Sequence, residues 1–262
     1  MKRGFLEILL LAQHKTDPNL ALHAKRVACY AAEIARILGH EEKYKKMFMA
    51  GLLHDLGFLS LDIHFTESAL DLTQEKALKQ FQSHVTESER LLSTLSSDKE
   101  LLETIRHHHE KYNGEGYPDQ LEGDNIPLGA RILAVADLYD SLLVGKLYGK
   151  KRITPAYAIE QMTKSNNEIS LDPTIVNALI KVLDKNPVLL QPEIHNALSV
   201  YKLIFLQAGV LMEGDLINQD GTVLVKQGYT LNEQTLEKIR LEFPGQKLIK
   251  PVEQELEENP ES

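Results

Sequence analysis

The stretch His108–Leu143 reads HHEKYNGEGYPDQLEGDNIPLGARILAVADLYDSLL and decides the fold. It begins with two adjacent histidines and a glutamate, passes through a Gly/Tyr/Pro loop and ends in a helix that is apolar nearly all round. A helix of this kind is typical of the buried centre of a domain. Asp137 lies inside it, and burying a carboxylate is costly unless a partner compensates the charge. A cluster of metal ions would supply that partner.

Helical periodicity continues on both sides of this stretch, up to about residue 206. An amphipathic helix is expected at the N-terminus, and further helices are expected at 19–38, 41–56, 73–95 and 99–109. After the central helix, Thr154-Pro155 and Asp172-Pro173 each resemble an N-cap followed by a proline at the first helical position. The predicted fold class is therefore mainly α, a helical bundle.

The character of the chain changes near residue 200. Gly209–Lys226 has short β-prone runs around Asp220-Gly221, which is a good hairpin signal. A short helix at 232–241 and a strand at 247–252 are expected next, followed by an acidic tail that is expected to be disordered. The predicted domains are a helical domain at 1–200, a small β-rich module at 201–252 and the tail at 253–262.

The composition argues against several classes of protein. No apolar run approaches the roughly 20 residues that a membrane span needs. The net charge of −9 argues against binding to nucleic-acid polymers, although metal ions could still attract a small anion. The single cysteine, Cys29, excludes an internal disulfide framework and predicts a cytoplasmic location.

Seven polar residues lie on or beside apolar helix faces in five separate segments. They are His23, His54, Asp55, His84, His108, His109 and Asp137. Imidazole and carboxylate ligands suit Zn, Fe, Mn or Ni, and no cysteine thiolate competes with them. One metal takes about four to six ligands, so seven candidates suggest two metals with an aspartate able to bridge them. Two metals about 3.5–4 Å apart can activate a water and clamp the oxygens of a phosphodiester.

Each of these residues also has an ordinary explanation. A lone His23 or His84 is more often a satisfied core or surface histidine, and His54-Asp55 could mark a helix C-terminus, where a histidine favours the dipole. Asp137 beside Asp140 is hard to explain as solvated surface. The set is far more specific than its members. The remaining histidines are interpreted as bystanders: His14, His40, His64, His107 and His195.

With these residues in view, the chain resembles the HD-GYP branch of the HD phosphohydrolase superfamily over roughly residues 5–190. The matching stretches are HAKRVA (23–28), LLHDLG (52–57), HHEKYNGEGYP (108–118), IPLGARILAVADLYDSL (126–142) and the helix that carries His84. The resemblance implies an HD-domain bundle that hydrolyses cyclic di-GMP to pGpG and/or GMP at an iron or manganese site. It implies metal ligation by the seven residues above, with Asp55 bridging the ions and orienting the attacking hydroxide.

The resemblance also implies a set of substrate contacts: Gly116, Tyr117, Pro118, Arg131 and Lys146. Two interpretations of the Tyr117-Pro118 loop stay open. It could shape the substrate pocket or dock diguanylate cyclase (GGDEF) partners, or it could be a rigid turn under the metal site. The segment after residue 206 is similar to a small β-rich module often attached to these domains. The oligomeric state is open, with a homodimer as one option.

Three positions depart from the family pattern, and a fourth is conservative. Asn19 replaces a glutamate that helps to hold a third metal; an amide is a poor ligand for a hard dication, so a third metal is not expected. Phe58 replaces a lysine that would neutralise phosphate charge. Losing that contact could lower the rate of hydrolysis by a factor on the order of 10²–10³. Asn113 replaces an aspartate in the loop. Lys146 replaces an arginine, keeping the charge without its bidentate geometry.

The leading hypothesis is therefore a cyclic di-GMP phosphodiesterase with two divalent metal ions. A second hypothesis is a degenerate domain that senses cyclic di-GMP or binds proteins without turnover, which Phe58 and Asn19 would favour. A third keeps the hydrolase and changes the substrate to cyclic GMP-AMP or another nucleotide, because HD metal sites host varied phosphate esters.

Overall fold

The computed structural model describes residues 3–61, 75–144, 153–164 and 170–185, together with short pieces between 216 and 235. The chain divides into two compact units, Met1–Pro192 and Glu193–Ser262. Within the described residues, none of the helices has both the length and the apolar character needed to cross a membrane.

The first unit is helical, which confirms the mainly α fold class. Its α-helices are α1 (Arg3–Thr16), α2 (Pro18–Ile37), α3 (Tyr44–Leu53), α4 (Glu75–Gln82), α5 (His84–Ser93), α6 (Lys99–Arg106), α7 (Leu128–Val144), α8 (Pro155–Thr163) and α9 (Pro173–Lys185). Short 3₁₀ turns join them at η1 (Glu41–Lys43), η2 (Leu56–Ser60) and η3 (Gly123–Asn125).

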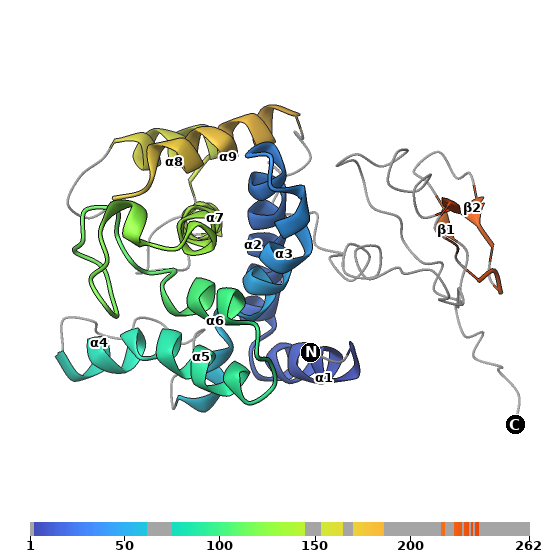
Figure 1. Cartoon of the computed structure of the whole chain (residues 1–262), viewed down its shortest axis with the longest axis horizontal. Helices are drawn as coiled ribbons and strands as arrows, with labels where there is room; N and C mark the ends of the chain where they lie inside the picture. Colours follow the sequence, from blue (N-terminus) through green and yellow to red (C-terminus); the bar gives the residue numbers. More distant parts are fainter. Residues whose placement is uncertain are drawn as a thin grey trace, which may run out of the picture. The chain divides into compact units, whose positions relative to one another are not determined.

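Helix α7 forms the centre of this unit. It packs against α2, α3, α6, α8 and α9, and Figure 1 shows it end-on between the blue pair α2/α3, α6 and the gold pair α8/α9. Ile132, Val135 and Tyr139 on this helix are fully buried. The prediction of a central buried helix is therefore confirmed, and Asp137 and Asp140 are carried into the core with it.

The helix starts follow the capping chemistry in the sequence. The Asp17 carboxylate accepts hydrogen bonds from the backbone N–H of Asn19 (2.8 Å) and Leu20 (3.1 Å), which fixes the start of α2. The predicted caps of α8 and α9 are confirmed: Thr154 accepts from the N–H of Tyr157, and Asp172 accepts from that of Thr174. Helix α2 thus begins at Pro18, five positions before His23.

The single helix expected at 73–95 is wrong, because the structure breaks it at Ser83 into α4 and α5. The Ser83 hydroxyl donates to the carbonyl of Gln80 at 2.7 Å, and the His84 ring lies 2.6 Å from the carbonyl of Phe81. Side chains that take helix carbonyls in this way compete with the backbone ladder and end it. The break makes His84 the first residue of α5.

In the second unit the described residues include one antiparallel strand pair, β1 (Leu216–Ile217) and β2 (Val223–Val225). Such a pair is what a hairpin around Asp220-Gly221 would require, although that turn lies outside the described residues. A β-rich subdomain is more than this pair can establish. The elements expected at 186–206 and 247–252 and the acidic tail also lie outside the described residues, as does most of the helix expected at 232–241.

Candidate metal centre

The structure brings all seven predicted ligands to one place in the first unit. They come from α2 (His23), the turn after α3 (His54, Asp55), the start of α5 (His84), the turn after α6 (His108, His109) and α7 (Asp137). Two groups of three have ligand atoms within 4.8 Å of one another. We call His23, His54 and Asp55 the first cluster, and His84, His108 and His109 the second cluster.

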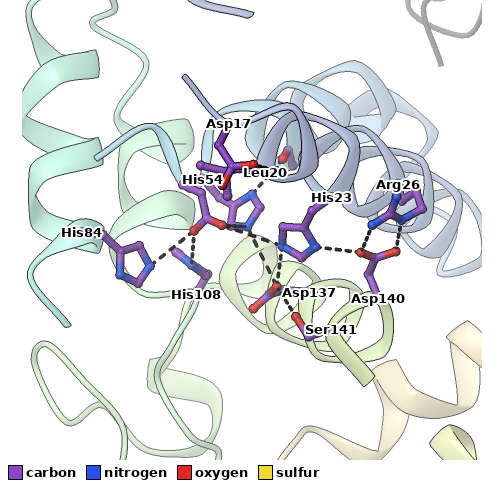
Figure 2. A network of polar contacts seen from close by, with 12 residues as sticks. Asp17, Leu20, His23, Arg26, His54, His84, His108, Asp137, Asp140 and Ser141 are labelled. Atoms are coloured by element: carbon purple, nitrogen blue, oxygen red, sulfur yellow. Dashed lines mark hydrogen bonds and ion pairs between the residues drawn. The ribbon is translucent and has the colours of Figure 1, made fainter. Parts of the chain in front are cut away.

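Asp55 belongs to the first cluster and also faces the second cluster. Its Oδ2 atom is 3.1 Å from His54 Nε2 and 3.7 Å from His23 Nε2. Its Oδ1 atom is 3.4 Å from His84 Nε2 and 4.0 Å from His108 Nε2. Figure 2 shows His84 and His108 approaching from one side, with His23 and Asp137 on the other. One carboxylate therefore presents one oxygen to each cluster, the placement that a bridging ligand needs.

Three of the histidines are held in the same way. In each, the ring Nδ1 atom lies 2.6–2.8 Å from the carbonyl oxygen three residues earlier. The pairs are His54 with Gly51, His84 with Phe81 and His108 with Ile105. Since a carbonyl can only accept, Nδ1 carries the hydrogen and Nε2 is left with its lone pair. This backbone support of the far ring nitrogen is the usual arrangement behind a metal-ligating histidine.

The same three Nε2 atoms, on His54, His84 and His108, are buried and have no hydrogen-bond partner. In the neutral form of His54, the 3.1 Å contact of its Nε2 atom with Asp55 joins two acceptors. Burial would lower the pKa of His54, but the Asp55 carboxylate outweighs it and raises the pKa, and a proton on Nε2 would turn this contact into a hydrogen bond. An unsatisfied buried acceptor costs about 1–3 kcal/mol. Divalent cations bound at the two clusters would satisfy all three atoms. The donor set, imidazoles and carboxylates with no thiolate, fits such ions.

The second cluster has the protonation state that metal binding requires. Burial lowers the pKa of His84 and His108. Burial, with a smaller contribution from His84, lowers the pKa of His109 to about 4. Neutral imidazoles are the ligating form, and here no proton has to be displaced at neutral pH.

The carboxylates of the centre are ionised. Burial alone would raise the pKa of Asp55, but the neighbouring histidines, His54 first, hold it well below its ordinary value. The pKa of Asp137 is lowered in the same way, chiefly by its contact with His23. Five imidazoles and two carboxylates in a buried space leave room for added positive charge.

His23 lies between two carboxylates. Its Nε2 atom is 3.0 Å from Asp137 Oδ1, and its Nδ1 atom is 2.7 Å from Asp140 Oδ2. Burial would lower the pKa of His23, but these two carboxylates outweigh it and raise the pKa to about 10. Arg26 in turn binds both oxygens of Asp140. A cation on the Nε2 side would take the place of the proton, while Asp140 keeps the ring in position.

Asp140 and Ser88 support the centre, and neither was among the predicted site residues. Asp140 could have been found from its i,i+3 spacing to Asp137 on a buried helix. Ser88 gave no signal in the sequence. Its hydroxyl donates to the carbonyl of His54 at 2.6 Å and accepts from the N–H of Gly57 at 2.7 Å. A Cβ atom at Gly57 would lie 2.1 Å from the carbonyl oxygen of His84, so this close approach requires glycine.

A third group of potential ligands lies beside the second cluster: His107, Glu110 and Asp119, which we call the loop cluster. Its polar atoms already have partners. His107 Nε2 lies 2.9 Å from Asp119, which also binds Arg106. The Glu110 carboxylate accepts from the backbone N–H of Asp119 (2.7 Å) and Leu121 (3.2 Å). These contacts fasten the loop that follows His109, and the exclusion of His107 from the ligand set stays a prediction.

The Gly/Tyr/Pro loop packs directly against the second cluster. The Tyr117 ring centre is 5.0 Å from that of His109, and the Tyr117 N–H donates to the carbonyl of His109 at 3.2 Å. A Cβ atom on Gly116 would lie 2.2 Å from the backbone nitrogen of Lys111. These contacts favour a rigid turn that supports the metal centre. Substrate contacts by Gly116, Tyr117 and Pro118 stay predictions.

The other predicted substrate contacts have different surroundings. Arg131 binds Asp124 at 2.6 Å and Asp172 at 2.8 Å, so carboxylates within the protein already balance its charge. Its role in binding substrate stays a prediction. Lys146 lies outside the described residues. Asn19 is exposed at the start of α2, where its backbone N–H is used in capping.

Comparison with known proteins agrees with this geometry. The family model described as "HD domain" matches residues 8–175. A 3'3'-cGAMP-specific phosphodiesterase 3 of Vibrio cholerae is 32% identical over 189 residues, 70% of this chain and 40% of that protein. The cyclic di-GMP phosphodiesterase response regulator RpfG of Xanthomonas campestris is 31% identical over 185 residues, 69% and 48% of the two chains. The matched region thus spans less than half of each relative.

Solved structures show the same fold. A cyclic GMP-AMP-specific phosphodiesterase of V. cholerae aligns with a TM-score of 0.57 at 20% identity, covering 91% of this chain and 58% of that one. The HDG"Y"P protein Bd1817 of Bdellovibrio bacteriovorus aligns with a TM-score of 0.51 at 21% identity, covering 62% and 51%. The resemblance of the helical domain to HD-GYP phosphodiesterases is confirmed, whereas the similarity of the segment after residue 206 to a β-rich module is not supported by these matches.

Proposed function

The chain belongs to the HD domain family, and from this membership we propose that it is a metal-dependent phosphodiesterase acting on a cyclic dinucleotide. We propose cyclic di-GMP as the substrate and pGpG and/or GMP as the product. Support comes from relatives named as cyclic di-GMP phosphodiesterases in several bacteria, each about 30% identical to this chain.

One observation carries the proposal. Three buried Nε2 atoms without partners converge with ionised carboxylates around Asp55. A core without a bound ion would hardly be built in this way, because each unpaired acceptor is destabilising. Degenerate domains that only bind proteins have no comparable need for these atoms.

Each residue has a proposed role in this centre. His23 and His54 would hold one ion, the second cluster would hold the other, and Asp137 would add a carboxylate on the His23 side. When bound, two such ions lower the pKa of a water and stabilise the charge on the phosphodiester oxygens. Asp55 would bridge the ions and orient the attacking water through its ionised oxygens. Burial of the surrounding side chains would exclude bulk water from the attack.

The phosphate charge must also be met by the protein. Lys146 is the proposed cationic contact, because Phe58 cannot neutralise a phosphate. Gly116, Tyr117 and Pro118 are proposed to line the substrate side of the second cluster. Arg131, on α7, is proposed as a further substrate contact. If these contacts are too weak, the same site would bind cyclic di-GMP without turnover.

A second substrate, 3'3'-cGAMP, has its own support. The first relative described above, which is specific for this molecule, is as similar to the chain as RpfG is. Both substrates carry two phosphodiesters in a ring and differ in one base, so the metal centre would treat them alike. The choice between them would lie in base contacts.

The remaining predictions are part of the same proposal. The two ions are proposed to be iron or manganese, with no third metal, since Asn19 offers an amide. The protein is proposed to be cytoplasmic, with GGDEF proteins as partners and a homodimer as one option for its assembly.

The deciding experiment measures turnover and metal together. Purified protein loaded with Mn²⁺, or with Fe²⁺ under anaerobic conditions, is given cyclic di-GMP and 3'3'-cGAMP separately, and linear products are separated by chromatography. We expect two ions per chain, release of pGpG, and loss of both properties in Asp55→Asn. His40→Gln, at a half-exposed histidine paired with Glu42, is the matched control and should keep both.

The outcomes separate the hypotheses. Faster cleavage of 3'3'-cGAMP would exchange the substrate and keep the reaction. If the protein binds two ions and either dinucleotide but releases no product, the sensor hypothesis is supported and the enzyme hypothesis is excluded. Absence of bound metal in the wild-type protein would overturn the proposal.

A further inference from the structure

Phe58 connects the two clusters of the metal centre. It lies in η2, three residues after Asp55, and its backbone N–H donates to the Asp55 carbonyl at 3.1 Å. Its ring lies on His84 of the second cluster, with ring centres 4.3 Å apart and planes 12° from parallel. One residue is therefore tied to Asp55 through its backbone and to His84 through its side chain.

The surroundings of this ring are apolar. Phe58 is only 5% exposed and belongs to a buried group with Leu20 and Phe81, against which the half-buried Leu61 also packs. The Phe81 ring lies 5.4 Å from Phe58 and 5.3 Å from His84, tilted to both. The position is thus part of the core, and its side chain does not line a surface that an anion could reach.

The His84 ring is restrained at two points. Its Nδ1–H donates to the Phe81 carbonyl at 2.6 Å, which fixes one ring edge. With this hydrogen bond alone, the imidazole ring could still rotate about the line from Nδ1 to the carbonyl oxygen. The Phe58 ring, stacked flat on the imidazole face, prevents that rotation. In the resulting orientation Nε2 points to Asp55 Oδ1, 3.4 Å away.

From this geometry we propose that Phe58 is a positioning residue for the second metal ion, holding the His84 imidazole in its ligating orientation. The inference rests on the proposed metal centre and gives a use to the position where the family pattern has lysine. Phe58 supports a ligand from inside the core. A lysine introduced here would place an ammonium among apolar side chains, which is costly. Phe58→Lys should therefore weaken metal binding and give no gain in turnover.

The test is a Co²⁺ titration of the full chain after removal of metal with a chelator. Visible absorption reports the environment of each ion, and melting of the metal-free protein reports packing separately. The variants are Phe58→Leu, which keeps an apolar side chain and loses the stack, and Phe58→Tyr, which keeps the ring. Leu20→Val is the matched control, because it reduces the same apolar group and leaves in place both the Phe58 ring and the carbonyl that hold His84.

We expect the wild type to bind two ions. In Phe58→Leu the affinity for one ion should fall roughly tenfold, at the lower end of the effect of losing an orienting partner, with a changed spectrum for that ion. Phe58→Tyr should keep the wild-type affinity and the wild-type spectrum. Leu20→Val should melt at a similarly lowered temperature and bind both ions as the wild type does. If Phe58→Leu does not fold, Phe58→Met carries the same expectation at closer volume.

Three results would count against the inference. Unchanged affinity in Phe58→Leu, with two ions bound by the wild type, would overturn it and leave the proposed function intact. Equal losses of metal affinity in Phe58→Leu and Leu20→Val would assign the effect to packing and would also overturn the inference. A wild-type protein that binds no Co²⁺, Mn²⁺ or Fe²⁺ would overturn the proposed function itself.

Discussion

Two groups of potential ligands lie side by side in this protein, and they differ in one decisive property. The loop cluster and the second cluster each offer three ligand atoms within 4.8 Å of one another, and they contain the neighbours His107 and His108. His107 Nε2 faces Asp119, whereas His108 Nε2 is buried with no hydrogen-bond partner. Ligand type and spacing alone therefore do not identify a metal site. In this comparison, a buried ligand atom without a protein partner is the property that favours a metal site.

The comparison also explains why charge differs between the groups. In the loop cluster an ion pair between Arg106 and the half-exposed Asp119 balances the carboxylate. In the metal centre the imidazoles of His84 and His108 are neutral, because burial lowers their pKa. The loop cluster is complete without a cation. The metal centre has lone pairs and ionised carboxylates in excess.

The largest effect that tests this comparison is expected when the neighbours His107 and His108 are substituted separately. His108→Gln removes an unpartnered ligand atom, so one ion should bind more than 100-fold more weakly, beyond the roughly 10–100-fold cost of losing an orienting partner. Turnover should fall on the order of 10³-fold. Metal analysis of the purified protein and a steady-state assay measure the two effects.

His107→Gln is the matched variant one residue earlier. It should lower the melting temperature through the lost contact with Asp119 and leave two ions bound. A comparable loss of metal in His107→Gln would show that the loop cluster is part of the centre, and the distinction drawn above would fail.

A smaller effect is expected at Asp140, which touches a ligand without being one. Asp140→Asn leaves His23 and Arg26 without the charge that holds them. Metal affinity at the first cluster should fall about 10–100-fold. Unfolding the metal-free protein should become easier by about 3–5 kcal/mol, because a buried cation loses its partner. Denaturant unfolding and metal titration separate the two, and unchanged affinity would limit Asp140 to a structural role.

Asp140 also shows how far sequence reasoning could go. The seven ligands were predicted because each is a polar residue on an apolar helical face, and the structure brings all of them together. The support of those ligands depends on contacts between different helices, such as those of Asp140 with His23 and Arg26, which are 117 and 114 residues away in the sequence. Periodicity in one helix carries no such information. The spacing of Asp137 and Asp140 was the one available sign.

In the fold, too, the features with a local sequence signal were predicted and those that depend on other contacts were not. Helix α7 and the caps at Thr154 and Asp172 were predicted, since an all-apolar helix and N-cap chemistry are local signals. The break at Ser83 was not predicted, because 73–95 has continuous amphipathic periodicity. It results from side chains taking backbone carbonyls at the point where His84 must face the metal centre.

Ser88 allows a finer test of how the centre is held. Ser88→Ala leaves the buried carbonyl of His54 and the N–H of Gly57 without their partner. The free energy of unfolding should fall by about 1–3 kcal/mol, and metal affinity by roughly fivefold, the equivalent of one hydrogen bond of about 1 kcal/mol. Ser93→Ala is the control, at an exposed serine on the same helix that binds the carbonyl of Arg90. Equal effects in the two variants would contradict a specific role for Ser88.

The smallest effect is expected where the comparison predicts no metal at all. Asp119→Asn removes the exposed ion pair with Arg106, which is worth at most about 1 kcal/mol, and it should leave two ions bound. The hydrogen bond from Arg106 lowers the pKa of Asp119 to about 2. Because the folded-state pKa is below the ordinary value near 3.8, this contribution is complete above pH 4 and is lost as the pH falls toward about 2.

Melting of metal-free protein between pH 2 and 7 should therefore show wild type and Asp119→Asn converging at the acid end and separating slightly above pH 4. The metal content of the two proteins, measured at pH 7, should be the same. If Asp119→Asn loses an ion, the carboxylate acts on the centre through the loop after His109. A satisfied hydrogen-bond network would then no longer be enough to mark a cluster as structural.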